Sequence, residues 1–461
     1  MVEASPLDGP RRLGIRPGHP AVFRLSLAAG SASAVRVSGL PDGLQFDPSA
    51  RIVRGRTRVR GNHALTISGE GKSAPWTDRV VIAVGDDICL TPPLGWNSWN
   101  SLGPAVSEED VRRTAAVLVS SGLADRGWAY LNIDDGWQGG RDRRGHLQPN
   151  GKFSDLKVLC ADLHELGLRV GIYSSPGSTT CGGFEGSAGH ELDDALSFGA
   201  WGFDYLKYDW CSAGPIGDDT PVADLAAPYE RMRVALNRVD RDIVYHISQY
   251  GFGNVWEWAR GRVGANAWRT TGDIVDEWPV VDQIGFGQAA ISAYSGPGGW
   301  NDADMLVVGN IGGAWNRPIE PSRLTPNEQR THFGLWVLLS GPLLLGCDVT
   351  RLDVDTTAMV SNRELLAIHQ DALGESARRR KASGDLEFWC KTLADGSVAV
   401  GIFNRGATTA VAGVAWAELE MRPARAVRDV WAQEDVDAGE GWQGTVPSHG
   451  SVILRQWSVE S

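Results

Sequence analysis

Aspartates recur in this sequence at the ends of short apolar segments that suit buried strands. They are Asp134 and Asp135 in YLNIDD, Asp209 in YLKYD, Asp273 in WRTTGD, Asp302 and Asp304 in GGWNDAD, and Asp348 in LLLGCD. One aspartate in such a place usually caps a helix or a turn. A whole set, interleaved with tryptophans, indicates instead a polar site with aromatic walls; the tryptophans are Trp99, Trp137, Trp210, Trp268 and Trp300. Carboxylates accept hydrogen bonds from hydroxyl groups and aromatic faces pack on C–H groups, so the expected ligand is neutral and polyhydroxylated.

Two carboxylates are enough to cleave a glycosidic bond, because one can attack the anomeric carbon while the other protonates the leaving oxygen. Competing chemistries lack their motifs. His164 and His190 precede glutamates without completing HExxH, and there is no GxSxG elbow of a serine hydrolase. A two-metal site is conceivable at NDAD (301–304), but the nine histidines do not cluster near it. We therefore expect neither a metal nor a cofactor.

The chain from about residue 91 alternates strand-like and helical patterns, as parallel α/β folds do. One unit is clear: apolar residues recur at helical spacing, Gly167 ends the helix and RVGIYSS follows as a strand; the helical set is Phe153, Leu156, Leu159, Leu163 and Leu166. Eight candidate strands predict a (β/α)8 TIM barrel, at 94–100, 130–136, 169–175, 204–210, 243–249, 268–274, 298–306 and 342–349. A doubly wound sheet is the alternative, although no GxGxxG or GxxxxGK[ST] loop follows these strands. In a barrel the C-terminal strand ends share one face, so the aspartates would meet there.

Two β-rich parts flank the predicted barrel, which spans 89–371. Residues 1–88 contain short alternating runs that predict a small β-sandwich, at 21–28, 32–40, 63–69 and 78–84. The phrase GLPDGLQFDPSARIVRG within them resembles bacterial immunoglobulin-like modules, so an Ig-like domain is expected. Residues 372–461 revert to runs such as LEFWCKTL and SVAVGIFN, which predict a C-terminal antiparallel β-sandwich domain.

Composition narrows the class of partner. The chain has 461 residues and a formal charge of −12, which argues against nucleic acid and anionic membranes. There is no run of about 18 apolar residues that would cross a membrane. Residues 1–15 show no apolar segment of a signal peptide. The expected partner is an oligosaccharide or another glycoside, and a homo-oligomer remains open.

Seven stretches together resemble glycoside hydrolase family 27, the family of α-galactosidases and α-N-acetylgalactosaminidases, which shares a clan with family 36. They are PPLGWNSWN, NIDDGW, GLRVGIYSSPGSTTCGGFEGS, DYLKYDWC, WRTTGDI, SGPGGWNDADML and LLSGPLLLGCDV. The resemblance covers about 91–371 in order and includes a C-terminal β-domain, whereas the N-terminal part lies outside the common core of the family.

The resemblance implies a retaining enzyme in which Asp209 is the nucleophile and Asp273 the general acid/base. It also implies a sugar subsite made by Trp99, Asp134, Asp135, Tyr173, Lys207, Arg269 and Asp304. Retention requires one ionised and one protonated carboxyl group about 5–5.5 Å apart. We expect Lys207 to keep Asp209 charged and the pKa of Asp273 to be raised. Arg269 is expected to bind substrate or another carboxylate rather than Asp273.

Cys181 and Cys211 match a cysteine pair that forms a disulfide in the family, between the loops after the third and fourth strands. Such a bridge favours an exported protein. A secreted or extracytoplasmic location is therefore expected, with a cytoplasmic one still open.

The chain departs from the family after the fifth strand. Family α-galactosidases usually carry a Cys-Glu-Trp-like sequence there that contacts the sugar near its 2-position, and Ser248, Gln249 and Tyr250 replace it here. The sequence thus supports the type of reaction better than the identity of the sugar that is cleaved. We expect an exo-acting α-galactosidase. The alternatives are an isomalto-dextranase, an α-N-acetylgalactosaminidase or a β-L-arabinopyranosidase, and, from another class, an inactive carbohydrate-binding barrel.

Overall fold

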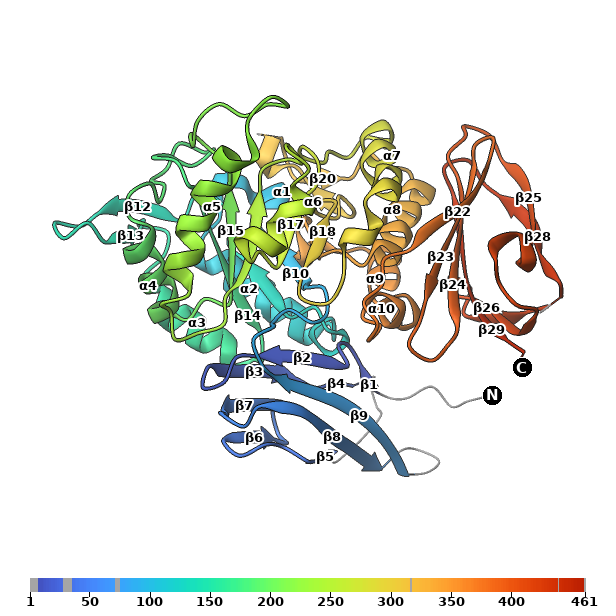
Figure 1. Ribbon diagram of the computed structural model, residues 1–461, viewed down its shortest axis with the longest axis horizontal. Helices are drawn as coiled ribbons and strands as arrows, with labels where there is room; N and C mark the ends of the chain where they lie inside the picture. Colours follow the sequence, from blue (N-terminus) through green and yellow to red (C-terminus); the bar gives the residue numbers. More distant parts are fainter. Residues whose placement is uncertain (1–6, 28–34, 71–74, 316, 438, 460–461) are drawn as a thin grey trace.

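The computed structural model describes residues 7–27, 35–70, 75–315, 317–437 and 439–459. Small sheets from the N-terminal part lie below a central α/β body, and a β-rich C-terminal part lies beside it (Figure 1). Ala28 of the predicted run 21–28 and residues 32–34 of the run 32–40 lie outside the described residues, as do 1–6 and 460–461 at the ends of the two predicted flanking domains.

The central sheet contains eight parallel strands. They are β10 (Leu94–Asn97), β11 (Tyr130–Asn132), β14 (Arg169–Ser174), β15 (Tyr205–Asp209), β16 (Val244–Ser248), β17 (Ala267–Arg269), β18 (Trp300–Asp302) and β21 (Leu343–Leu345). Seven lie within predicted segments, and β17 begins one residue before its segment, 268–274. Their order is β18-β17-β16-β15-β14-β11-β10-β21. The sheet curls until Leu306, after β18, pairs in parallel with Leu345 of β21. The architecture is therefore TIM-like.

Most strands are shorter than their predicted segments, because the polar ends of those segments belong to the loops. β11 ends at Asn132, so Asp134 and Asp135 lie beyond it, and β17 ends at Arg269, four residues before Asp273. Asp348 follows β21 and caps a short 3-10 helix, since its side chain accepts from the Thr350 amide. The capping interpretation thus holds for this aspartate.

Helices connect the strands and cover the sheet, as the alternation predicted. They are α1 (Trp99–Leu102), α2 (Glu108–Ser120), α3 (Leu156–Glu165), α4 (Glu191–Trp201), α5 (Val222–Leu236), α6 (Val255–Trp258), α7 (Trp278–Gly287), α8 (Pro326–Leu339), α9 (Val354–Val360) and α10 (Arg363–His369). Asp155 caps α3, and Gly167 follows that helix with a φ of 74°. Leu166, expected on the apolar face of α3, lies at its C-terminal end and is exposed, whereas Leu168, just before β14, is buried.

The N-terminal part forms small sheets around one apolar core. A four-stranded sheet has the order β2-β9-β8-β5 and a three-stranded sheet the order β3-β7-β6, with β1 paired to β4. The strands are β1 (Leu7–Asp8), β2 (Arg12–Ile15), β3 (Pro20–Arg24), β4 (Ser26–Leu27), β5 (Val35–Ser38), β6 (Leu44–Asp47), β7 (Ile52–Arg56), β8 (Gly61–Glu70) and β9 (Pro75–Val84). Whether this part is Ig-like stays a prediction. It is tied to the barrel by ion pairs such as Arg16–Asp242 (2.6 Å) and Arg24–Asp125 (2.8 Å).

The C-terminal part is an antiparallel β-sandwich, as predicted. One sheet has the order β22-β23-β24-β29-β26-β27, and β25 pairs with β28. The strands are β22 (Arg378–Ser383), β23 (Leu386–Thr392), β24 (Val398–Asn404), β25 (Ala410–Ala415), β26 (Ala424–Asp429), β27 (Glu434–Val436), β28 (Gly441–Val446) and β29 (Ser451–Ser458). Helix α8 of the barrel packs against β24 and β29.

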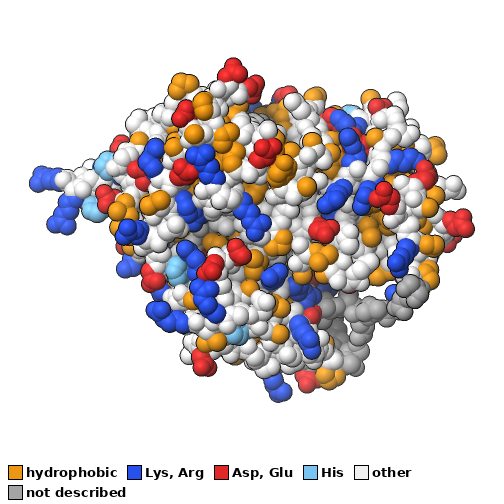
Figure 2. All heavy atoms as spheres, in the orientation of Figure 1, with side chains coloured by type: hydrophobic (Ala, Val, Ile, Leu, Met, Phe, Trp, Pro, Cys, Tyr) orange, Lys and Arg blue, Asp and Glu red, His pale blue; other side chains and the backbone are white. Residues whose placement is uncertain are grey.

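The surface in the view of Figure 2 mixes acidic and basic side chains. Among the described residues, no helix combines the length and the apolar character that a membrane span requires.

Candidate active site

Asp209 ends β15 and lies at the C-terminal face of the curled sheet, buried to 7% exposure. Lys207, two residues earlier, lies on the same side of the strand, with Nζ 3.9 Å from Asp209 Oδ2. The Lys207 ammonium is closer to Asp134, to which it donates a hydrogen bond of 2.9 Å. Burial raises the pKa of Asp209 above its ordinary value; Lys207 opposes that shift, and the charge of Asp273 adds to it. Lys207 thus favours the charged form of Asp209, as expected, although burial has the larger effect on this pKa.

Two tyrosine hydroxyls hold the Asp209 carboxylate, one on each oxygen. Tyr250 donates to Oδ1 at 2.7 Å, and Tyr173, at the end of β14, donates to Oδ2 at 3.2 Å. Hydrogen bonds to an ionised group are stronger than those between neutral groups. The pair therefore stabilises the charged form of a carboxylate that burial disfavours.

Asp134 and Asp135 follow β11 where the chain turns. Gly136 makes this turn with a φ of 106°, and a Cβ there would lie 2.7 Å from Pro104 Cα, so only glycine fits. Both carboxylates are almost fully buried. Asp135 accepts a 2.6 Å hydrogen bond from the Gly182 amide, and burial raises its pKa to about 6. The turn lets two consecutive aspartates lie at the same face, as the sequence suggested.

Arg269 at the end of β17 joins two carboxylates. Its Nη2 lies 3.0 Å from Asp304 Oδ2 and 3.1 Å from Asp273 Oδ1. The expectation that Arg269 would not contact Asp273 is therefore wrong, because the loop after β17 curls back over the strand end. The contact with another carboxylate, that of Asp304 just after β18, agrees with the second half of that expectation.

Asp273 and Asp304 differ in exposure although both contact Arg269. The Asp273 side chain is 69% exposed and that of Asp304 is 4% exposed. Burial raises the pKa of Asp304 to about 6. Partial burial also favours a higher pKa for Asp273, but Arg269, together with Lys207, outweighs it and holds that pKa below its ordinary value. The raised pKa expected for Asp273 is therefore not found.

The three residues that replace the family sequence after β16 point in different ways. The Ser248 side chain is fully buried, and within the described part of the chain its Oγ has no hydrogen-bond partner. Gln249 is also fully buried and donates from Nε2 to the Phe252 carbonyl at 2.5 Å. Tyr250 is half-buried and reaches back to Asp209. Ser248 pairs with Asp209 through the backbone of the sheet, and Tyr250 contacts Asp209 through its side chain.

Trp99 is half-buried at the start of α1, and its amide donates to Asn97 Oδ1 at 2.8 Å. Asn97 itself was missed by the sequence analysis. It ends β10 and donates from Nδ2 to Asp134 Oδ2 at 2.7 Å, so its side chain holds both the Trp99 amide and the Asp134 carboxylate. Asn97 lies in the middle of the predicted segment 94–100 and carries no carboxylate, so the pattern that indicated the aspartates did not indicate it.

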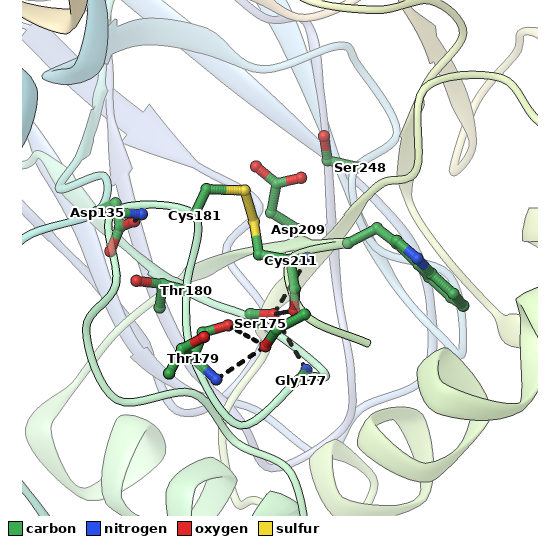
Figure 3. The surroundings of a disulfide bond; sticks show 12 residues. Asp135, Ser175, Gly177, Thr179, Thr180, Cys181, Asp209, Cys211 and Ser248 are labelled. Carbon is green, nitrogen blue, oxygen red and sulfur yellow. Dashed lines mark hydrogen bonds between the residues drawn. A yellow bond between two sulfur atoms is a disulfide. The ribbon is translucent and has the colours of Figure 1, made fainter. Parts of the chain in front are cut away.

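Cys181 and Cys211 form a disulfide, which confirms the pairing implied by the family resemblance. It joins the loops after β14 and β15, and Figure 3 shows it beside the Asp209 carboxylate. Tyr173 Oη lies 3.3 Å from Cys211 Sγ, and Tyr250 Oη lies 3.9 Å from Cys181 Sγ. The bridge therefore packs against both hydroxyls that hold Asp209.

One group of described residues, Cys181, Asp209 and Cys211, brings three atoms of metal-ligating types together. Because the two sulfurs are bonded to each other, neither is a thiolate that could hold a cation.

Comparisons with known proteins match two parts of the chain to described families. A family model described as alpha galactosidase A matches residues 91–371, and one described as the alpha galactosidase C-terminal beta sandwich domain matches 383–456. The α-galactosidase of Cyamopsis tetragonoloba is 40% identical over 347 residues, which cover 74% of this chain and 80% of the relative.

Solved structures include one that is similar to this chain over nearly its whole length. A Bacteroides fragilis protein provisionally assigned as an α-galactosidase/melibiase superposes with a TM-score of 0.92 at 35% identity, covering 98% of this chain and 97% of the other. An α-galactosidase of Saccharomyces cerevisiae solved with raffinose has a TM-score of 0.71 at 26% identity and covers 80% of this chain and 98% of the other. The chain belongs to glycoside hydrolase family 27, the α-galactosidase family, and is a glycoside hydrolase.

Proposed function

We propose that this protein is a retaining, exo-acting α-galactosidase that uses Asp209 as nucleophile and Asp273 as general acid/base. The observation that carries the proposal is the contrast between these carboxylates. Asp209 is buried and held on both oxygens by tyrosine hydroxyls, whereas Asp273 is exposed on the neighbouring loop. A fixed nucleophile and an accessible proton carrier are what double displacement needs.

In the first step a carboxylate oxygen of Asp209 bonds to the anomeric carbon of the galactosyl group. The bond from that carbon to the glycosidic oxygen breaks, and the oxygen leaves with the proton of Asp273. The products of this step are a covalent glycosyl ester at Asp209, an ionised Asp273 and the released alcohol.

In the second step Asp273 accepts a proton from water as the water oxygen attacks the anomeric carbon. The ester bond to Asp209 breaks and its electron pair returns to the carboxylate. Because each step inverts the anomeric carbon, the product is α-galactose. Asp273 is again protonated and Asp209 ionised.

Asp273 must carry a proton in the first step, although Arg269 lowers its pKa in the free protein. A bound glycoside would exclude water from the exposed Asp273 carboxyl group, and desolvation favours the neutral acid. A sugar hydroxyl that accepts a hydrogen bond from Arg269 would also weaken the contact with Asp273. Substrate binding itself would therefore raise the pKa of the acid.

The sugar subsite of this proposal is formed by the predicted binding residues at the strand ends. Asp134, Asp135 and Asp304 would accept hydrogen bonds from sugar hydroxyls, and Lys207 and Arg269 would donate to them. The half-buried Trp99 would pack on the sugar ring. An extracytoplasmic location is part of the proposal, because the Cys181–Cys211 disulfide suits an oxidising compartment.

The test is a panel of nitrophenyl glycosides combined with the stereochemistry of the first product. We expect hydrolysis of the α-galactoside to exceed that of the α-glucoside, the α-N-acetylgalactosaminide and the β-L-arabinopyranoside, and proton NMR to detect α-galactose first. A preference for another glycoside would contradict galactose as the substrate sugar and would identify the preferred sugar instead. No turnover on the panel or on natural oligosaccharides, with sugar binding retained, would favour the inactive binding barrel.

A further inference from the structure

Tyr250 has a backbone conformation that tyrosine rarely adopts. Its φ is 67°, in the left-handed region that is a genuine outlier for a bulky side chain. Gly251 continues the turn with a φ of 93°, and a Cβ on it would lie 2.2 Å from the Thr270 carbonyl oxygen. The turn is therefore pressed against the segment after β17, and this packing fixes where the Tyr250 side chain emerges. Such conformations persist where the surrounding structure enforces them, and they concentrate at functional sites.

The consequence of this turn is the position of the Tyr250 hydroxyl. It donates to Asp209 Oδ1 at 2.7 Å, whereas Tyr173 donates to Oδ2 at 3.2 Å and Lys207 lies 3.9 Å from Oδ2. The two carboxylate oxygens are thus unequal. Oδ1 has the short, charge-assisted bond, and Oδ2 has the longer contacts and more freedom to react.

We propose that Tyr250 is a catalytic residue of the reaction set out above, on which this inference rests: its hydroxyl holds Oδ1 of Asp209, so Oδ2 forms the glycosyl ester. Oδ1 then becomes the ester carbonyl oxygen and keeps its bond to Tyr250. In the second step the bond from Oδ2 to the anomeric carbon breaks, and the charge that returns to the carboxylate strengthens the bond from Tyr250. The hydroxyl therefore promotes departure of Asp209 from the sugar.

The donor is available at any working pH. Burial, and next the neighbouring charge of Asp209, raise the pKa of the Tyr250 hydroxyl, so it keeps its proton. The bond in turn lowers the pKa of Asp209 against the effect of burial. Loss of the hydroxyl should therefore do two things: raise the pH at which Asp209 ionises and slow the second step.

The experiment compares Tyr250→Phe with wild type on nitrophenyl α-galactoside, where the good leaving group makes the first step fast. We expect kcat to fall between about tenfold and a hundredfold, the effect of one hydrogen bond to a charged group. KM should fall with it, a burst of nitrophenolate should precede the steady state, and the acidic limb of kcat/KM should move to higher pH. Tyr245→Phe is the matched control, because it also removes a buried hydroxyl, one that donates to the Tyr229 carbonyl.

A fall in kcat/KM without a burst and with the acidic limb unmoved would overturn the proposal, as would an unchanged kcat. A wild-type protein without turnover would instead refute the proposed function, and this inference with it. If Tyr250→Phe does not fold, 3-fluorotyrosine at position 250 tests the same bond. Its more acidic hydroxyl should move the acidic limb to lower pH, and an unmoved limb would count against the role.

Discussion

Lys207 lies between two buried carboxylates, and its removal gives the sharpest test of the electrostatics of the site. Its Nζ is 2.9 Å from Asp134 Oδ2 and 3.9 Å from Asp209 Oδ2, and its side chain is 10% exposed. Lys207→Met keeps most of the side-chain volume and removes the charge. Asp209 would then remain buried without its nearest cation.

The size of the effect follows from the distance. Two unit charges about 4 Å apart interact by about 4 kcal/mol at an effective dielectric constant of about 20, which corresponds to about 3 pKa units. Burial already raises the pKa of Asp209 above its ordinary value of 3.8. Since loss of the cation raises it further, Asp209 should be protonated, and so unreactive, up to a pH as much as about 3 units higher than in wild type.

The assay is the pH dependence of kcat/KM, whose acidic limb reports the ionisation of the nucleophile in the free enzyme. Lys207→Met should move that limb to higher pH and recover activity as the pH rises. Lys207→Arg is the control: it keeps the charge, so the limb should stay in place even if the rate falls. An acidic limb at the wild-type pH in Lys207→Met would refute the electrostatic reasoning.

Three further predictions concern stability. Replacing Cys181 and Cys211 by alanine opens a loop with a sequence separation of 30, which should cost about 3–4 kcal/mol and lower kcat as well; thermal melts that are identical with and without the bridge would contradict this. Burial lowers the pKa of Lys391 from 10.5 to about 7, so the unfolded chain binds more protons than the folded chain between these values and stability should rise with pH there. Lys391→Met should remove that rise in melts at pH 7 and 9, and an equal rise in the variant would exclude Lys391 as its source. Asp242→Ala removes the carboxylate partner of Arg16 and should destabilise the protein by about 1–3 kcal/mol, whereas Asp240→Ala, at an exposed ion pair with Arg56, should change the melting temperature little. Equal effects of the two would argue against a structural role of the Arg16 contact.

The sequence predicted the barrel because its strands are apolar and its helices periodic. These are local patterns, and β15 and α3 lie where the patterns indicated. The patterns could not distinguish the role of Asp209 from that of Asp348, because both stand at the end of a predicted strand. Asp348 caps a helix because the chain coils immediately after it, whereas Asp209 meets side chains from β14 and from the turn after β16.

The contacts of Arg269 and Tyr250 lay beyond sequence reasoning for a different reason. Both depend on the shape of a loop: the one after β17 brings Asp273 back to Arg269, and the left-handed turn at Tyr250 directs a hydroxyl to Asp209. The pKa directions of Asp209 and Asp273 depend in turn on burial and on these contacts. Residue types indicated the chemistry, and loop geometry decided which groups meet.

Double displacement requires a covalent bond between Asp209 and the sugar. To trap it, the protein is reacted with a fluorinated α-galactosyl fluoride whose ester forms quickly and hydrolyses slowly, and the product is digested and analysed by mass spectrometry. We predict one added fluorogalactosyl group on the peptide that contains YLKYDWC, located at Asp209. A label on any other residue, or release of the β-anomer of the fluorinated sugar without a label, would show that Asp209 is not the nucleophile.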